Sequence, residues 1–86
     1  MITIYSKESC FFCSAAIALA EEKQMKHTVM KIGKDISEGE FKTEFPNART
    51  VPQITNKIST GYIEYIGGHA EFKNWVLSKS LGEMTI

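Results

Sequence analysis

Two cysteines separated by two residues, Cys10 and Cys13, constrain this chain more than any other feature of its sequence. They are its only cysteines, and they lie where one structural pattern gives way to another. Residues 2–6 alternate and are rich in β-branched and aromatic types, which predicts a strand. The alanine-rich run that follows predicts a helix over about residues 11–24. The pair therefore belongs to a strand-to-helix junction.

The first predicted helix has an apolar side. Phe12, Ala16 and Leu19, with Ala20 beside them, fall on one face at helical spacing. We expect this face to pack against the sheet, and we expect Phe12 either to pack there or to line a groove.

Strand and helix patterns continue to alternate along the chain. Residues 27–32 predict a second strand, which Gly33 ends. Ser37 and Glu40 have the spacing of a capping box, and they predict the start of a second helix that Pro46 ends.

The second half of the chain predicts a hairpin and a closing helix. Residues 52–57 and 62–66 predict two strands joined by a turn within 56–61. The side of the closing helix that we expect to be apolar contains Phe72, Trp75, Val76 and Lys79. The order βαβαββα predicts an α/β fold, with a parallel pair at the N-terminus and an antiparallel hairpin later. The expected architecture is a four-stranded mixed sheet flanked by three helices.

The length and charge of the chain limit the classes of protein to which it can belong. Its 86 residues are expected to form a single domain, residues 1–86. Ten acidic and ten basic residues give a formal net charge of zero, which argues against a dedicated nucleic-acid binder. No stretch has the roughly 18 apolar residues of a membrane span, and the N-terminus lacks the pattern of a signal peptide. We expect a cytoplasmic monomer that binds neither nucleic acid nor membrane.

Several roles for the cysteine pair are open at this point. A stable structural disulfide is unusual in the cytoplasm, so the pair is expected to be catalytic or metal-binding. A zinc site would need two more ligands, and the spacing of His27 and His69 does not match a zinc finger. Two buried, unreactive cysteines are a third alternative. The position between a strand and a helix favours redox chemistry without a metal.

Redox chemistry at this junction has a physical rationale. If the helix begins near Cys10, unpaired backbone N–H groups and the positive end of the helix dipole face its sulfur and favour the thiolate. Lys7 adds a second positive charge three residues upstream. The thiolate is the nucleophile, so Cys10 would attack a substrate disulfide. Cys13, almost one turn later, would then resolve the mixed disulfide by internal attack.

Three motifs follow one another along the chain: YSKESCFFC, RTVPQI and IGGHAEF. Their sequence and order resemble those of the glutaredoxins, a family of the thioredoxin-like superfamily, over almost the whole chain. The resemblance implies a thioredoxin-like fold and a dithiol thiol–disulfide oxidoreductase. Glutathione would be its reductant, and protein disulfides or glutathione mixed disulfides its substrates. Ribonucleotide reductase is a plausible electron acceptor, and the short chain resembles phage-encoded members of the family.

The resemblance also assigns glutathione-binding roles to residues of all three motifs. Lys7 and Arg49 would meet the glycine carboxylate of glutathione. The expected glutathione-binding residues are Lys7, Phe12, Arg49, Thr50, Val51, Pro52, Gly68, His69 and Ala70.

Two backbone features are implied in the same way. A cis peptide bond between Val51 and Pro52 would place the Val51 backbone beside Cys10, where it can pair with an extended thiol-bearing peptide. The backbone N–H groups of His69 and Ala70, at the start of the last helix, would receive the γ-glutamyl carboxylate.

The chain departs from the family pattern at two places. Phe11 and Phe12 stand between the cysteines, where many relatives have proline and tyrosine, and we expect Phe11 to be exposed as a contact for a protein substrate. Ala70 stands where many relatives have an aspartate that meets the amino group of glutathione. Either the affinity for glutathione is weaker, or Glu71 substitutes for that aspartate.

Two further functions stay open on the sequence alone. The first is a thioredoxin-like electron donor that a flavoprotein reductase recharges. The second is a carrier in which two chains and two glutathiones hold a [2Fe–2S] cluster through the first cysteine.

Overall fold

Four strands and three helices form the computed structural model, which describes the backbone of residues 1–84 and the side chains of residues 1–79. The elements are β1 (Ile2–Ser6), α1 (Phe11–Glu22), β2 (His27–Lys31), α2 (Glu38–Glu44), β3 (Gln53–Lys57), β4 (Ile63–Gly67) and α3 (His69–Met84). The predicted order βαβαββα is confirmed, and the predicted strand boundaries are wrong by at most one residue. Within the described residues, no helix is both long enough and apolar enough to cross a membrane.

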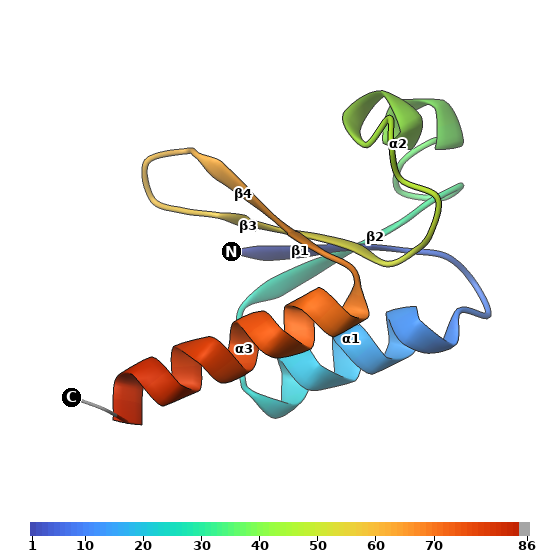
Figure 1. Cartoon of the computed structure of the whole chain (residues 1–86). Coiled ribbons are helices and arrows are strands. Elements are labelled where there is room, and N and C mark those ends of the chain that lie inside the picture. Colours follow the sequence, from blue (N-terminus) through green and yellow to red (C-terminus); the bar gives the residue numbers. More distant parts are fainter. Residues whose placement is uncertain (85–86) are drawn as a thin grey trace.

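The strands form one mixed sheet in the order β2-β1-β3-β4. β1 is parallel to β2 and antiparallel to β3, while β3 and β4 form the predicted antiparallel hairpin. Helices α1 and α3 cover one face of the sheet, and α2 lies on the other (Figure 1). The hairpin turn includes Gly61, whose φ of 88° lies in the region that favours glycine.

The alternation of side chains along β1 divides the core between the two faces. Ile2 and Ile4 belong to the cluster under α1 and α3, together with Ala16, Ala20, Ile54, Phe72 and Val76. Tyr5 points to the opposite face, where it packs with Ile32 and Phe41 beneath α2. Its hydroxyl donates a hydrogen bond to Glu44 at 3.1 Å. Both layers therefore meet on the central strand that leads directly to the cysteines.

The helix α2 begins as the sequence predicts. Ser37 is the N-cap, and its hydroxyl oxygen accepts a hydrogen bond from the Glu40 backbone N–H at 3.0 Å. The Glu40 carboxylate accepts the reciprocal bond from the Ser37 N–H at 3.2 Å. This capping box fixes the first turn of α2 and with it the position of Glu38.

Phe12 does not pack against the sheet, because its side chain is 56% exposed. It lines a pocket instead, which is the second of the two positions expected for it. The buried positions are Cys13, Ala16 and Ala20, and Leu19 is only partly buried. A side chain at Cys13 shares the inner face because it stands three and seven residues before Ala16 and Ala20. The helix ends two residues earlier than predicted, and Gln24 follows with a left-handed φ of 54°.

Replacing Ile54 by valine tests how much the core cluster under α1 and α3 contributes to the stability of the protein. Ile54 is fully buried on β3, so Ile54→Val is expected to lower the free energy of unfolding by about 0.5–1.5 kcal/mol. Ile63→Val on β4 removes the same methylene from a side chain that is 53% exposed, and it should change that free energy by less than about 0.5 kcal/mol. Urea unfolding of both variants tests this, and equal losses would contradict the assignment of the core.

Candidate active site

Cys10 is the N-cap residue of α1. Its backbone is extended, with φ −107° and ψ 111°, and its sulfur accepts a hydrogen bond from the Cys13 backbone N–H at 3.2 Å. The preceding residue, Ser9, has a left-handed φ of 56°, which turns the chain from the end of β1 into the helix. The sulfur therefore takes the place that a serine or aspartate oxygen usually occupies at the start of a helix.

The loop before β3 approaches the same sulfur from the other side. The Val51–Pro52 peptide bond is cis, as the resemblance implies. The Cys10 Sγ lies 3.8 Å from the Val51 carbonyl oxygen, within reach of a weak S–H···O hydrogen bond. The backbone of Val51 thus lies beside the outer thiol, where an extended peptide could pair with it.

Cys13 differs sharply from Cys10 in its surroundings. Its side chain is only 2% exposed, whereas Cys10 is half-buried. Burial raises the pKa of the Cys13 thiol to about 12, and hydrogen bonding to the Cys10 sulfur and the charge there act in the same direction. Only a backbone hydrogen bond from Lys7 opposes this shift. Cys13 is therefore a protonated thiol at neutral pH, and it is suited to act after Cys10.

A hollow of about 430 Å³ lies on the α2 side of the Val51 loop. Four of the expected glutathione-binding residues line it: Lys7, Arg49, Thr50 and Val51. Three residues of α2, Glu38, Phe41 and Lys42, also line it. The Lys7 ammonium forms an ion pair with the Glu38 carboxylate at 3.2 Å.

A second hollow of about 250 Å³ lies between the Val51 loop and the start of α3. It is lined by Phe12, Thr50, Val51, Pro52, Gly68, His69, Ala70 and Glu71. Thr50 and Val51 line both hollows, so the two hollows adjoin the loop beside Cys10, and together they are called the binding groove below. All nine residues expected to bind glutathione lie along this binding groove.

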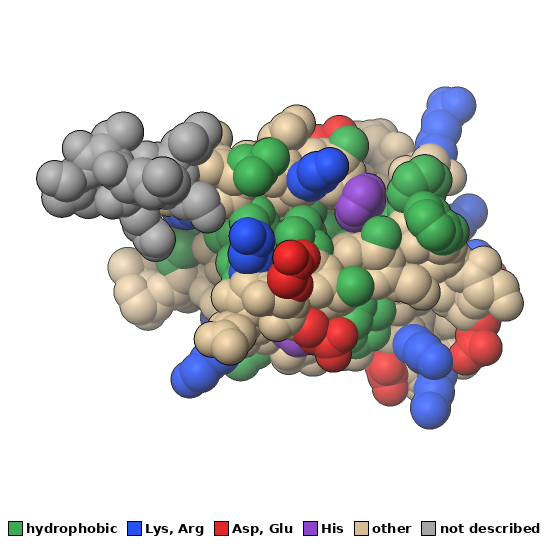
Figure 2. Space-filling model, turned by 90° about the horizontal axis from the view of Figure 1, so that it is seen from below, with side chains coloured by type: hydrophobic (Ala, Val, Ile, Leu, Met, Phe, Trp, Pro, Cys, Tyr) green, Lys and Arg blue, Asp and Glu red, His purple; other side chains and the backbone are tan. Residues whose placement is uncertain are grey.

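Aromatic rings form a rim at the α1 end of the groove. The centroids of Phe11 and Phe12 lie 5.4 Å apart with the rings edge to face, and Phe12 and His69 lie 5.7 Å apart. Phe11 is 78% exposed, as expected from the sequence. Figure 2 looks onto the face formed by α1 and α3 and shows hydrophobic side chains gathered at one end, beside a histidine. This rim offers an apolar contact next to the outer thiol.

Glu71 has a role at the start of α3 that sequence reasoning missed. Its carboxylate accepts a hydrogen bond from the Gly68 backbone N–H at 2.8 Å, which caps the helix. A Cβ at Gly67 would lie only 2.9 Å from the Glu71 Cβ, and the φ of Gly67 is 123°. The spacing of Gly68 and Glu71, three residues apart at the start of the helix, is the signal that could have identified this cap.

The comparisons with known proteins agree with this geometry. The glutaredoxin family model matches residues 2–57. The chain belongs to the glutaredoxin family. Family and fold together make it a thiol–disulfide oxidoreductase, and its Cys-x-x-Cys motif is Cys10 and Cys13. A comparison with curated protein sequences gives no significant match.

Solved structures of glutaredoxins share its fold. Glutaredoxin 1 from Francisella tularensis, complexed with cacodylate, is 26% identical with a TM-score of 0.67, and the match covers 94% of this chain and 95% of that one. Glutaredoxin from Brucella melitensis is 19% identical with a TM-score of 0.70, covering 96% and 85%. The buckwheat glutaredoxin–glutathione complex is 19% identical with a TM-score of 0.71, covering 96% and 74%. The predicted thioredoxin-like fold is confirmed.

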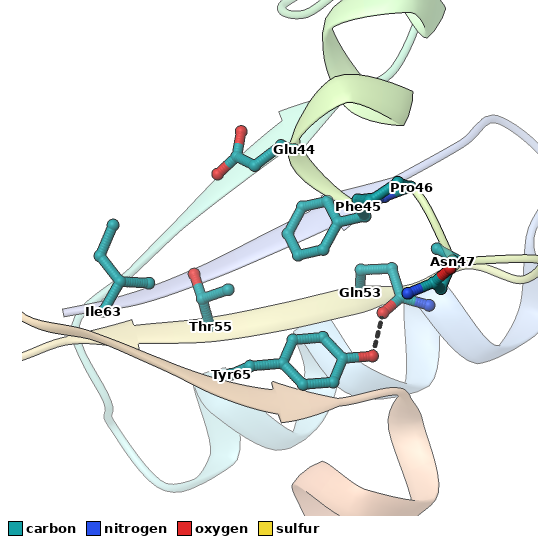
Figure 3. A pocket seen from close by; sticks show the side chains of 9 residues that line it. Glu44, Phe45, Pro46, Asn47, Gln53, Thr55, Ile63 and Tyr65 are labelled. Atoms are coloured by element: carbon teal, nitrogen blue, oxygen red, sulfur yellow. Dashed lines mark hydrogen bonds between the residues drawn. The ribbon is translucent and has the colours of Figure 1, made fainter.

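This glutaredoxin has another hollow that the sequence did not predict. It measures about 460 Å³ and lies between the end of α2 and the strands β3 and β4. Figure 3 shows Phe45 above the strands and the Tyr65 hydroxyl donating a hydrogen bond to Gln53. Neither cysteine lines this hollow, so it is not part of the redox site. Among the side chains of residues 1–79, no three histidine, cysteine or acidic groups gather as a possible metal site.

The raised pKa of Cys13 predicts how the stability of the reduced glutaredoxin varies with pH. The unfolded chain releases the Cys13 proton near pH 9, while the folded protein keeps it until about pH 12. As pH rises between these values the unfolded state binds fewer protons, so the free energy of unfolding falls. Urea unfolding from about pH 8 to about pH 11 should show a steeper fall for the wild type than for Cys13→Ala. Parallel curves would contradict the burial of this thiol.

Proposed function

We propose that this glutaredoxin is a glutathione-dependent enzyme that reduces protein disulfides or glutathione mixed disulfides through Cys10 and Cys13. The observation that carries the proposal is the binding groove, which passes beside Cys10 and is lined by all nine residues that the family resemblance implicates. The buckwheat relative with the same fold is a complex with glutathione, which supports the same ligand here.

The two ends of the groove match the two ends of glutathione. Lys7 and Arg49 provide cationic donors for the glycine carboxylate. At the other end, the first N–H groups of α3 have no partners within the helix and suit the γ-glutamyl carboxylate. The Val51 backbone lies between these ends, beside Cys10, where it would hold the cysteinyl part of the ligand.

The reaction cycle that we propose consists of thiol–disulfide exchanges. The Cys10 thiolate attacks one sulfur of the substrate disulfide, and the other sulfur leaves as a thiolate that takes up a proton. With a protein disulfide, Cys13 then loses its proton and attacks the Cys10 sulfur, which releases the second substrate thiol and forms the Cys10–Cys13 disulfide. Two glutathione molecules restore the dithiol and leave as glutathione disulfide. The sum is one disulfide reduced and two glutathiones oxidised.

The burial of Cys13 divides the two substrate classes. Its thiol stays protonated at neutral pH, so its attack on the mixed disulfide needs a proton to be removed first. A glutathione mixed disulfide can avoid this step, because a second glutathione can attack the Cys10–glutathione bond directly. Cys13 is then needed only for protein disulfides.

Single serine substitutions test this division of labour. We expect Cys10→Ser to abolish both activities, because it removes the attacking sulfur. We expect Cys13→Ser to lose reduction of a protein disulfide but to keep removal of glutathione from a glutathionylated peptide. Steady-state rates on both substrates provide the measurement. Full activity of the Cys10→Ser protein would reverse the assigned roles of the two cysteines.

The source of electrons is tested separately. The oxidised protein should return to its dithiol form with reduced glutathione alone, which thiol titration after removal of glutathione would show. If glutathione has no effect and a thioredoxin-reductase-type flavoprotein is required, the thioredoxin-like alternative replaces this proposal.

The exposed aromatic rim supports a protein substrate with an apolar residue next to its disulfide. Ribonucleotide reductase remains our proposed acceptor by family analogy. We propose the cytoplasm as the place of action, because glutathione is kept largely reduced there.

A further inference from the structure

The binding groove contains a carboxylate where an anionic ligand would place its own. Glu38 lines the same hollow as Lys7 and Arg49, and its Oε1 lies 3.2 Å from the Lys7 ammonium. Among the residues that line this hollow, Lys7, Lys42 and Arg49 are cationic, and Glu38 is the one acid. The Lys7 ammonium, with which a ligand carboxylate would pair, therefore already has an acidic partner within the chain.

The local structure holds Glu38 in this place. It is the first residue of α2, directly after the N-cap Ser37, and the capping box fixes that turn. A negative side chain is favoured at the N-terminus of a helix. The Glu38 side chain is 69% exposed, so the ion pair can exchange with a ligand rather than block it outright.

We propose that Glu38 sets the selectivity of this end of the groove by acting through Lys7. A ligand carboxylate has to replace Glu38 as the partner of Lys7 and then remains close to the displaced negative charge. Glu38 therefore weakens the binding of ligands that end in a carboxylate here, as glutathione does with its glycine. An internal segment of a protein chain has no carboxylate at this point and meets a neutral ion pair instead.

The opposite end of the groove does not discriminate in this way. The γ-glutamyl group of glutathione carries both a carboxylate and an ammonium. The N–H groups at the start of α3 suit the first, and the Glu71 carboxylate lines the hollow where it could meet the second. The proposed effect of Glu38 thus acts at one end of the groove only, and it rests on the proposed function. It favours protein disulfides over glutathione adducts as substrates.

The substitution Glu38→Gln tests the inference with two substrates that differ in one charge. The first is a mixed disulfide between glutathione and a cysteine peptide, and the second carries the ethyl ester of the glycine carboxylate. For the free acid, Glu38→Gln should lower KM about two- to fivefold at low salt without changing kcat. For the ester, KM should not change. High salt should shrink the effect on the acid.

Glu8→Gln is the matched control. It also removes one negative charge and breaks one exposed ion pair, that of Glu8 with Lys31 at 3.0 Å, but Glu8 does not line the groove. Glu8→Gln should leave KM unchanged for both substrates, and melting curves of both variants should confirm folding.

The outcomes separate the two claims. Suppose that the wild type reduces the glutathione adduct, but Glu38→Gln leaves KM unchanged, as Glu8→Gln should, or changes KM equally for the free acid and the ester. The role proposed for Glu38 is then wrong, and the proposed function stands. If the wild type does not reduce the adduct at all, the proposed function fails and the inference fails with it.

Discussion

The hydrogen bond from the Cys13 backbone N–H to the Cys10 sulfur is the interaction on which the site depends. It makes the outer cysteine the cap of α1, so that the Cys13 N–H, which has no partner within the helix, bonds to sulfur. The same turn places Cys13 on the inner face with Ala16 and Ala20. One helix start therefore creates two thiols of opposite character, one at the groove and one in the core.

The rest of the fold brings binding elements to that helix start. β1 lies in the interior of the sheet, and the chain that follows it places the cysteines at one end of the sheet. The loop that contains Val51 and Pro52 leads directly into the neighbouring strand β3 and contacts Cys10 there. The helices α2 and α3 then border the groove on its two sides, with Glu38 at one end and Glu71 at the other. Each acid also lies at the N-terminus of its helix, so Glu38, which we propose sets selectivity, lies where a negative charge also stabilises the start of α2.

Local patterns in the sequence were sufficient to predict the helices and strands and to name the residues that line the groove. The capping box of Ser37 and Glu40, the strand pattern of residues 2–6 and the three motifs each specify geometry within a few neighbouring residues. The sequence left two positions open for Phe12, and Phe12 lines the groove because Cys13, as apolar as a small core residue, occupies the inner side of α1. The pair of Lys7 and Glu38 could not be predicted, because it joins side chains 31 positions apart whose distance only the tertiary fold sets.

The unequal exposure of the two thiols is the central claim, and timed alkylation of the reduced protein tests it most directly. With limiting iodoacetamide near pH 7, mass spectrometry of the digested protein should show Cys10 modified at least about ten times faster than Cys13. Equal rates at the two cysteines, or faster modification of Cys13, would contradict the account.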